Sequence, residues 1–227
     1  MANIILGWAI LSRLISMKVQ TFAVGKVSTN CYVVSCEENG EAVIVDPAFD
    51  RFSEAEEVFG VIDEARLKLK FIVNTHGHPD HTCGNGFVKD RFSVPILVHE
   101  KDAHYLGETG LGIAQLFGFG GSPAADVLLQ DGDLVRFGKA TLRVAHTPGH
   151  SLGGISLIGE REVFTGDTLF AGSIGRMDFP DSSEEDMKNS LVKLARLPDS
   201  FVVYPGHGPA TMIGREKHSN RFLKQLT

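Results

Sequence analysis

The sequence predicts an α+β protein in which two β-sheets pack face to face and helices cover the outside. From Lys18 onward, short runs rich in Val, Ile and Phe alternate with turn signals, and these runs outnumber the helical segments. The helices fall between the strands, an order that favours packed sheets over a helical bundle. The sequence contains no short-period repeat and no low-complexity tract.

Ten strands are expected from the apolar runs and the turn residues that bound them. In chain order they cover residues 18–24, 30–35, 42–46, 70–74, 95–98, 134–137, 140–145, 155–158, 162–165 and 201–204. Asn30-Cys31-Tyr32 begins the second strand and is expected to support the sheet below a site, with a substrate contact through Tyr32 as the alternative.

Three helices are expected between and after these strands. The first covers 53–68, where Ser53 and Glu56 have the spacing of a capping box. The second covers 183–197, begins at Ser182 or Ser183 and ends before Pro198, and the third covers 215–225.

The stretch 107–123 is expected to be irregular, because it contains six glycines with Phe117 and Phe119 among them. It would be a surface loop or a mobile apolar wall over a site.

The 227 residues, 43% of them hydrophobic and 22% charged, suit one globular domain over 17–227. Residues 4–11 are apolar, but the run stops at Arg13 and is shorter than the ~20 residues that span a bilayer. It also lacks the basic start and the cleavage site of a signal peptide. We therefore expect 1–16 to be a dispensable extension, with a docked amphipathic helix and an export signal as alternatives.

Charge and cysteine content limit the partners and the compartment. The net charge of −6 argues against non-specific nucleic-acid binding, because neutralising phosphates requires a basic surface. Cys31, Cys36 and Cys83 form no CxxC pair, and their odd number argues against a disulfide framework. These features predict a cytoplasmic protein with neither nucleic acid nor membrane as a partner, and they leave the oligomeric state open.

Three histidines and an aspartate are packed into Thr75-His76-Gly77-His78-Pro79-Asp80-His81, directly after a predicted strand. In an extended chain residues i and i+2 project to the same side, so His76 and His78 would begin one metal site. Pro79 turns the chain, so Asp80 and His81 would face the same cavity and serve a second ion. Zinc binds imidazole and carboxylate, and iron and manganese accept the same ligands.

Further ligands are expected at the ends of three other strands. His150 lies in a Pro-Gly turn after one strand, Asp167 follows another, and His207 lies between two glycines after a third. Loops at strand ends can converge, so these residues would complete the site. The remaining histidines, His99, His104, His146 and His218, are expected to be structural, with His146 as a candidate neighbour of the ligands. Cys83 is expected to be a small buried residue.

The pattern His76-x-His78-x-Asp80-His81, followed by His150, Asp167 and His207, resembles the metallo-β-lactamase superfamily over residues 18–227. The resemblance implies a four-layer αββα sandwich. It also implies a first ion on His76, His78 and His150, a second on Asp80, His81 and His207, and Asp167 as the bridge between them. A bridging aspartate is typical of the glyoxalase II-like branch, so antibiotic hydrolysis is not expected.

Two loops indicate which members of the superfamily the sequence resembles most. Residues 166–170 and 175–180 are similar to loops of short glyoxalase II-like hydrolases and of persulfide dioxygenases, whereas 211–216 with Asn220 resembles the short hydrolases best. Glyoxalase II itself carries a helical carboxyl-terminal domain that binds glutathione, and with 20 residues after His207 this sequence is not expected to form one.

The resemblance implies a binuclear metallohydrolase whose metal-bridging hydroxide attacks a thioester or ester carbonyl. Two divalent ions are expected, zinc first, with iron or manganese as alternatives. Asp80 would orient the hydroxide, and Arg176 would bind the carboxylate of an anionic substrate such as S-lactoylglutathione, unless it forms a structural ion pair with Asp178.

Two other functions stay open. A mononuclear iron persulfide dioxygenase would use His76, His150 and Asp167. A non-catalytic binding module would have lost at least one ligand, and all seven are present.

Overall fold

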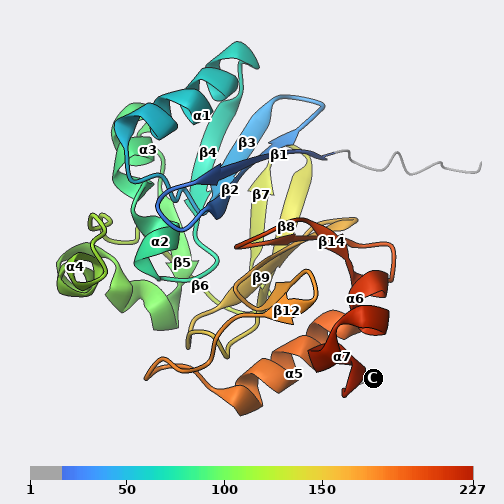
Figure 1. Cartoon of the computed structure of the whole chain (residues 1–227). Helices are drawn as coiled ribbons and strands as arrows, with labels where there is room; N and C mark the ends of the chain where they lie inside the picture. Colours follow the sequence, from blue (N-terminus) through green and yellow to red (C-terminus); the bar gives the residue numbers. More distant parts are fainter. Residues whose placement is uncertain (1–16, 227) are drawn as a thin grey trace, which may run out of the picture.

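Two six-stranded mixed sheets form the centre of the molecule, which the computed structural model describes over residues 17–226 (Figure 1). The first sheet has the order β1-β2-β3-β4-β5-β6 and the second the order β14-β13-β10-β9-β8-β7, while β11 and β12 form a small separate hairpin. This arrangement confirms the predicted α+β sandwich.

The strands of the first sheet are β1 (Met17–Val24), β2 (Thr29–Cys36), β3 (Glu41–Val45), β4 (Lys68–Val73), β5 (Ile96–His99) and β6 (Val127–Leu129). Those of the second sheet are β7 (Leu134–Phe137), β8 (Ala140–His146), β9 (Ile155–Ile158), β10 (Glu162–Gly166), β13 (Val202–Pro205) and β14 (Thr211–Met212), and the hairpin is β11 (Leu169–Phe170) with β12 (Ser173–Ile174).

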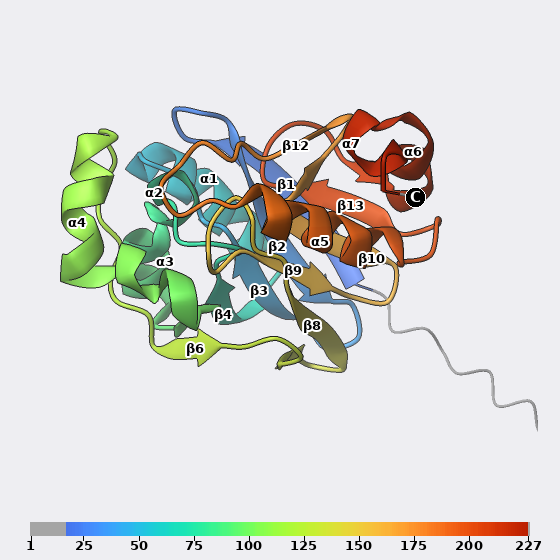
Figure 2. The ribbon, with the colours of Figure 1, turned by 90° about the horizontal axis from the view of Figure 1, so that it is seen from below.

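The helices are α1 (Phe52–Glu64), α2 (Pro79–Thr82), α3 (Asn85–Phe92), α4 (Gly107–Leu116), α5 (Glu184–Ala195), α6 (Ile213–Ser219) and α7 (Arg221–Lys224), with a 3-10 helix, η1, over Glu100–Tyr105. Figure 2 shows α1 and α3 beside the first sheet, and α5 beside the second.

The side chains of each strand point alternately to its two faces, and the apolar ones among them form three layers. In β2, Val33 packs in the cluster shared with α1 and α3, whereas Val34 packs between the two sheets. In the second sheet, Phe164 of β10 faces the first sheet and Val163 packs with the apolar side chains of α5. Both faces of each central strand are therefore buried, and the four-layer order follows.

Each of the ten predicted strands is present, but the helix predictions need correction. Helix α1 begins at Phe52 after Arg51, which makes no side-chain cap, so the capping box predicted at Ser53 is wrong. The helix ends at Glu64, and Arg66 adopts a left-handed φ of 51° before β4 begins. The second prediction is confirmed, since Ser183 caps α5 by accepting a hydrogen bond from the Asp186 amide at 3.2 Å.

The segments at 107–123 and 215–225 differ from expectation. Residues 107–116 form helix α4 despite three glycines, and Gly110 is needed there because a Cβ would lie 1.7 Å from the Tyr105 carbonyl oxygen. The predicted helix over 215–225 is split into α6 and α7 at Asn220, whose side chain accepts a hydrogen bond from the Phe222 amide.

Three further expectations concern a membrane-spanning helix, residues 1–16 and the cysteines. Over residues 17–226 no helix has the length and apolar character to cross a bilayer. The predictions for 1–16 lie outside the described residues. The three cysteines are free and buried, and burial was predicted for Cys83.

Candidate metal centre

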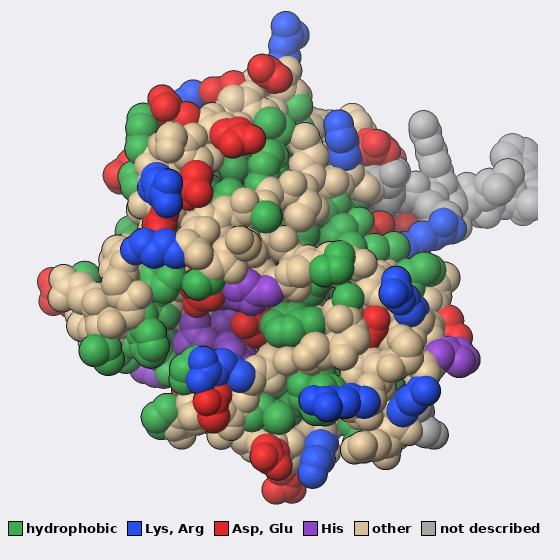
Figure 3. All heavy atoms as spheres, viewed as in Figure 1, with side chains coloured by type: hydrophobic (Ala, Val, Ile, Leu, Met, Phe, Trp, Pro, Cys, Tyr) green, Lys and Arg blue, Asp and Glu red, His purple; other side chains and the backbone are tan. Residues whose placement is uncertain are grey.

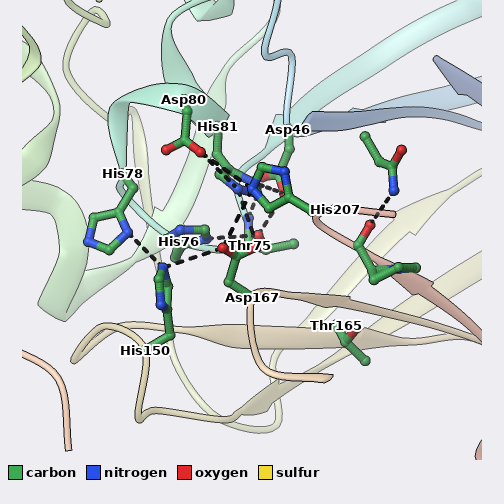
Figure 4. A network of polar contacts seen from close by, with 12 residues as sticks. Asp46, Thr75, His76, His78, Asp80, His81, His150, Thr165, Asp167 and His207 are labelled. Atoms are coloured by element: carbon green, nitrogen blue, oxygen red, sulfur yellow. Dashed lines mark hydrogen bonds and ion pairs between the residues drawn. The ribbon is translucent and has the colours of Figure 1, made fainter. Parts of the chain in front are cut away.

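The site lies where segments that follow four strands meet (Figure 4). The segment 75–81 follows β4 of the first sheet, whereas His150, Asp167 and His207 follow β8, β10 and β13 of the second. Parallel pairing of β10 with β13 places the last two residues side by side. The chain thus brings all seven predicted ligands together from both sheets.

Local backbone geometry explains how one short segment supplies four of these side chains. His78 has an extended backbone with φ −62° and ψ 145°, and Pro79 occupies the first turn of α2. Proline suits that position because its φ is preset and its missing N–H needs no partner there. His76 therefore comes from a bend after β4, His78 from extended chain, and Asp80 and His81 from the helix, so the extended conformation predicted for this segment holds at His78 but not at His76.

The ligand atoms fall into three overlapping groups, each with its atoms within 4.8 Å of one another. The groups are His76, His78 and His150; His76, His81 and Asp167; and Asp80, His81 and His207. Nδ1 of His78 lies 2.9 Å from Nε2 of His150, close to the roughly 3.3 Å expected for two nitrogens on one tetrahedral ion.

Hydrogen bonds at the far side of each ring orient the histidines. Nδ1 of His81 donates to Asp46 Oδ2 at 2.9 Å, and Nδ1 of His150 donates to the carbonyl oxygen of Arg176 at 2.8 Å. Thr75 Oγ1 donates to Asp46 at 2.6 Å and so accepts from Nδ1 of His76 at 3.2 Å. Because Nδ1 of each of these three rings is used on the far side, Nε2 is the nitrogen that each ring turns toward the cluster, the orientation in which it can bind a metal.

Three buried atoms inside the cluster have no hydrogen-bond partner. They are Nε2 of His76, Nε2 of His81 and Oδ1 of Asp167. Buried polar atoms are normally paired, and these three are good metal ligands that point toward one another. The cluster therefore fits a metal site.

The electrostatic environment favours the protonation states that bind metal ions at most positions. Burial lowers the pKa of His76 well below its usual value, and burial with the neighbouring His150 lowers that of His78 to about 4. Burial opposes ionisation of Asp80 and Asp167, but the adjacent His81 lowers the pKa of both carboxyls. Burial also disfavours charge on His81, yet Asp167 and the other carboxylates around it raise its pKa well above the usual value. A cation at its Nε2 would replace that proton.

Aromatic rings line the cluster on its open side, where Figure 3 shows histidine side chains in a recess of the surface. The ring of Phe179 lies 5.1 Å from that of His78, Tyr105 lies 5.3 Å from His78, and Phe170 lies 6.0 Å from His207. These rings give the cluster an apolar border beside His78 and His207.

The other predicted residues lie as follows. Arg176 forms two 2.6 Å hydrogen bonds with Asp178 and stacks over Phe179, so the ion pair given as the alternative is present. Cys83 is buried and its Sγ contacts the carbonyl of Ala48. Tyr32 donates to the Pro205 carbonyl and packs between the sheets, which is the supporting role expected for it.

Asp46 is a functional neighbour that sequence reasoning missed. It directly follows β3, so the strand-end signal that identified Asp167 was available for it too. His146 stacks on His99, and its hydrogen bonds within residues 17–226 are to Asp131, Leu152 and Lys193 rather than to a ligand.

The fold and its cluster of histidines and aspartates at the ends of two facing sheets define a known class of protein. The chain belongs to the metallo-β-lactamase superfamily, whose family model matches residues 24–207. It is 36% identical over 216 residues to the hydroxyacylglutathione hydrolase GloC of Haemophilus influenzae, covering 91% of this chain and 98% of that one. It is 32% identical over 213 residues to the probable metallo-hydrolase YqgX of Bacillus subtilis, covering 91% and 98%.

Comparison with solved structures also finds similar folds. The crystal structure of BLEG-1 B3 metallo-β-lactamase superposes with a TM-score of 0.82 at 36% identity, covering 91% of this chain and 99% of that one. TTHA1623 in a di-iron-bound form gives 0.80 at 31% identity, covering 90% and 100%. ETHE1 from Myxococcus xanthus gives 0.75 at 28% identity, covering 90% and 83%.

Proposed function

We propose that the protein is a binuclear metal-dependent hydrolase that cleaves a thioester or ester, with small anionic acyl-thiols such as S-lactoylglutathione as its substrates. The position of Asp167 carries the proposal. Its Oδ1 lies 3.4 Å from Nε2 of His81, while its Oδ2 lies 3.5 Å from Nε2 of His150 and 3.6 Å from Nε2 of His207. One carboxylate thus faces both ligand groups, as a bridge between two ions requires.

In this proposal the first ion is held by His76, His78 and His150, the second by Asp80, His81 and His207, and Asp167 is shared. The ions, when bound, supply a water of lowered pKa and positive charge for the substrate carbonyl oxygen. Zinc suits these ligands, and iron or manganese would also be accepted.

Asp80 has the properties needed to orient the attacking water. His81 and His207 keep its carboxyl ionised against the effect of burial, and its Oδ2 lies 3.4 Å from Nε2 of His207. Its side chain is 23% exposed, so its second oxygen remains available to accept a hydrogen bond. A thiolate leaving group needs little protonation, which favours thioesters over amides.

The similarity to GloC supports thioester substrates, and the net charge of −6 supports a small molecule rather than nucleic acid. We place the reaction in the cytoplasm and expect no membrane partner.

A persulfide dioxygenase with one iron at His76, His150 and Asp167 is the second candidate. The likeness to ETHE1 favours it, because that structure covers 90% of this chain at 28% identity. The two candidates differ in their need for oxygen, since hydrolysis consumes none.

Thiol release from S-D-lactoylglutathione tests the proposal under anaerobic conditions, with protein reconstituted separately with zinc, manganese or iron. We expect a kcat/KM above roughly 10⁴ M⁻¹s⁻¹ with at least one metal. Absence of release with every metal would contradict it, and oxygen consumption with a glutathione persulfide would then support the dioxygenase. A parallel β-lactam assay is needed because of the likeness to BLEG-1, and turnover of a β-lactam alone would also contradict the proposal.

Arg176 is proposed to bind the substrate carboxylate while it keeps its ion pair with Asp178, because the two hydrogen bonds of that pair use only Nε and Nη2 of the guanidinium. Its guanidinium is held by Asp178 and lies 4.5 Å from the Phe179 ring, which itself packs against His78 and His150. Replacing Arg176 by alanine should raise KM about 10-fold with little change in kcat, because a contact equal in ground and transition states affects binding alone. The control is Arg91→Ala, which removes an exposed arginine paired with Asp63. Unchanged KM in both variants would assign Arg176 a structural role only.

A further inference from the structure

Asp102 is a buried carboxylate that the proposed reaction does not use. It lies in η1, directly after β5, and its side chain is fully buried. It belongs to none of the groups whose atoms fit a metal ion. A buried charge is costly unless hydrogen bonds compensate it, so its partners are informative.

Those partners come from the two loops that carry the ligands of the first ion. Oδ2 accepts hydrogen bonds from the Gly77 amide at 2.9 Å and from Ser151 Oγ at 2.7 Å, and Oδ1 accepts from the Gly153 amide at 2.5 Å. Gly77 lies between His76 and His78, and Ser151 directly follows His150. One carboxylate therefore joins the two chain segments that supply all three histidines.

Close packing makes this junction specific. A Cβ on Gly77 would lie 2.7 Å from both the Asp102 carbonyl oxygen and the Tyr105 Cβ, and one on Gly153 would lie 2.5 Å from Asp102 Oδ1. Both loops thus approach η1 as closely as a glycine backbone permits. Among the ligands of the second ion, His81 is oriented by Asp46 rather than by Asp102.

We propose that Asp102 is a positioning residue for the first metal ion: it fixes the loop of His76 and His78 against the loop of His150 and thereby sets the affinity of that ion. The inference rests on the ligand assignment above and is independent of the substrate. Burial raises the pKa of the Asp102 carboxyl while its three donors oppose that shift, an arrangement in which every partner stabilises the carboxylate. Its carboxylate also contacts the backbone of both loops whose imidazoles would bind a dication.

The test replaces Asp102 by asparagine, which keeps the shape but turns an NH₂ group toward an N–H or O–H donor. Glu216→Gln is the matched control. Glu216 is also fully buried and accepts three hydrogen bonds, from Thr211 Oγ1 at 2.7 Å, the Gly172 amide at 2.8 Å and Asn220 Nδ2 at 2.9 Å, but none comes from a histidine loop.

Zn²⁺ affinity is measured by competition with a chromophoric chelator, and Co²⁺ absorption reports the ligand geometry. A His207→Ala background isolates the first ion, and a His150→Ala background isolates the second. We expect Asp102→Asn to weaken binding of the first ion about 10- to 100-fold and to change its Co²⁺ spectrum. The affinity for the second ion should change less than about 3-fold. Glu216→Gln should lower the thermal stability by a similar amount but leave the affinity for the first ion unchanged.

The inference would be overturned if binding of both ions weakened equally, or if binding of the first ion did not weaken. If Asp102→Asn does not fold, Ser151→Ala removes one donor and keeps the carboxylate, and it should weaken the first ion selectively by a smaller factor. Because the readout is metal affinity, a failed thioester assay would leave this result interpretable.

Discussion

Replacing Asp167 by asparagine is expected to lower kcat/KM for thioester hydrolysis by about 10³-fold. Its Oδ1 is buried without a hydrogen-bond partner, and its two oxygens face Nε2 of His81 and Nε2 of His150 from opposite sides. Asparagine retains the volume but removes the negative charge and offers an NH₂ group that cannot bind a cation. Both ions should therefore bind more weakly, and the metal content after gel filtration should fall below two per chain.

The control is Asp199→Asn, which removes a carboxylate that is 64% exposed and forms an ion pair with Lys217 at the surface. It should leave kcat/KM and metal content unchanged. If Asp167→Asn kept two tightly bound ions and full activity, Asp167 would not be a bridge, and the binuclear proposal would lose its main support.

The ligand positions were predictable because their signals are local. His76, His78, Asp80 and His81 are four polar side chains within six residues, a density that folding alone does not require. His150, Asp167 and His207 each follow an apolar strand, and strand ends in facing sheets converge at one edge. The sequence could place these residues at one edge without any knowledge of the distances between them.

The residues that orient the ligands were not predictable in the same way. Asp102 contacts Ser151, which lies 49 residues further along the chain, and Asp46 contacts Thr75 and His81, which lie 29 and 35 residues away. Such contacts depend on how β3, β5 and the second sheet are stacked. No periodicity in the sequence records that stacking, although the position of Asp46 at a strand end was a partial signal.

The errors in secondary structure have a similar origin. Glycines at 107, 110 and 112 predict a loop, yet Gly110 lies within α4, where the close approach of the preceding Tyr105 backbone leaves no space for a Cβ. Strands β11, β12 and β14 have two residues each, which is too short for a period of two to be visible.

Replacing Gly206 by alanine is expected to disrupt the metal centre without removing any ligand. A Cβ at this position would lie 2.1 Å from Asp167 Oδ1 and 2.7 Å from Cε1 of His81, distances that force one of the two side chains to move. The backbone cannot retreat easily, because the Gly206 amide donates to the Gly166 carbonyl at 2.8 Å and its own carbonyl accepts from the Asn30 amide at 2.7 Å.

A displacement of about 1 Å at a reacting centre can cost on the order of 10²-fold in rate, so kcat/KM should fall at least that far and metal affinity should fall with it. Gly120→Ala is the control, since a Cβ at Gly120 meets no atom within 4 Å and should change neither quantity. Near-normal activity and two bound ions in Gly206→Ala would mean that the bridging carboxylate tolerates displacement. A loss of metal together with activity would instead show that the absence of a side chain beside His207 is as necessary to the site as the ligands themselves.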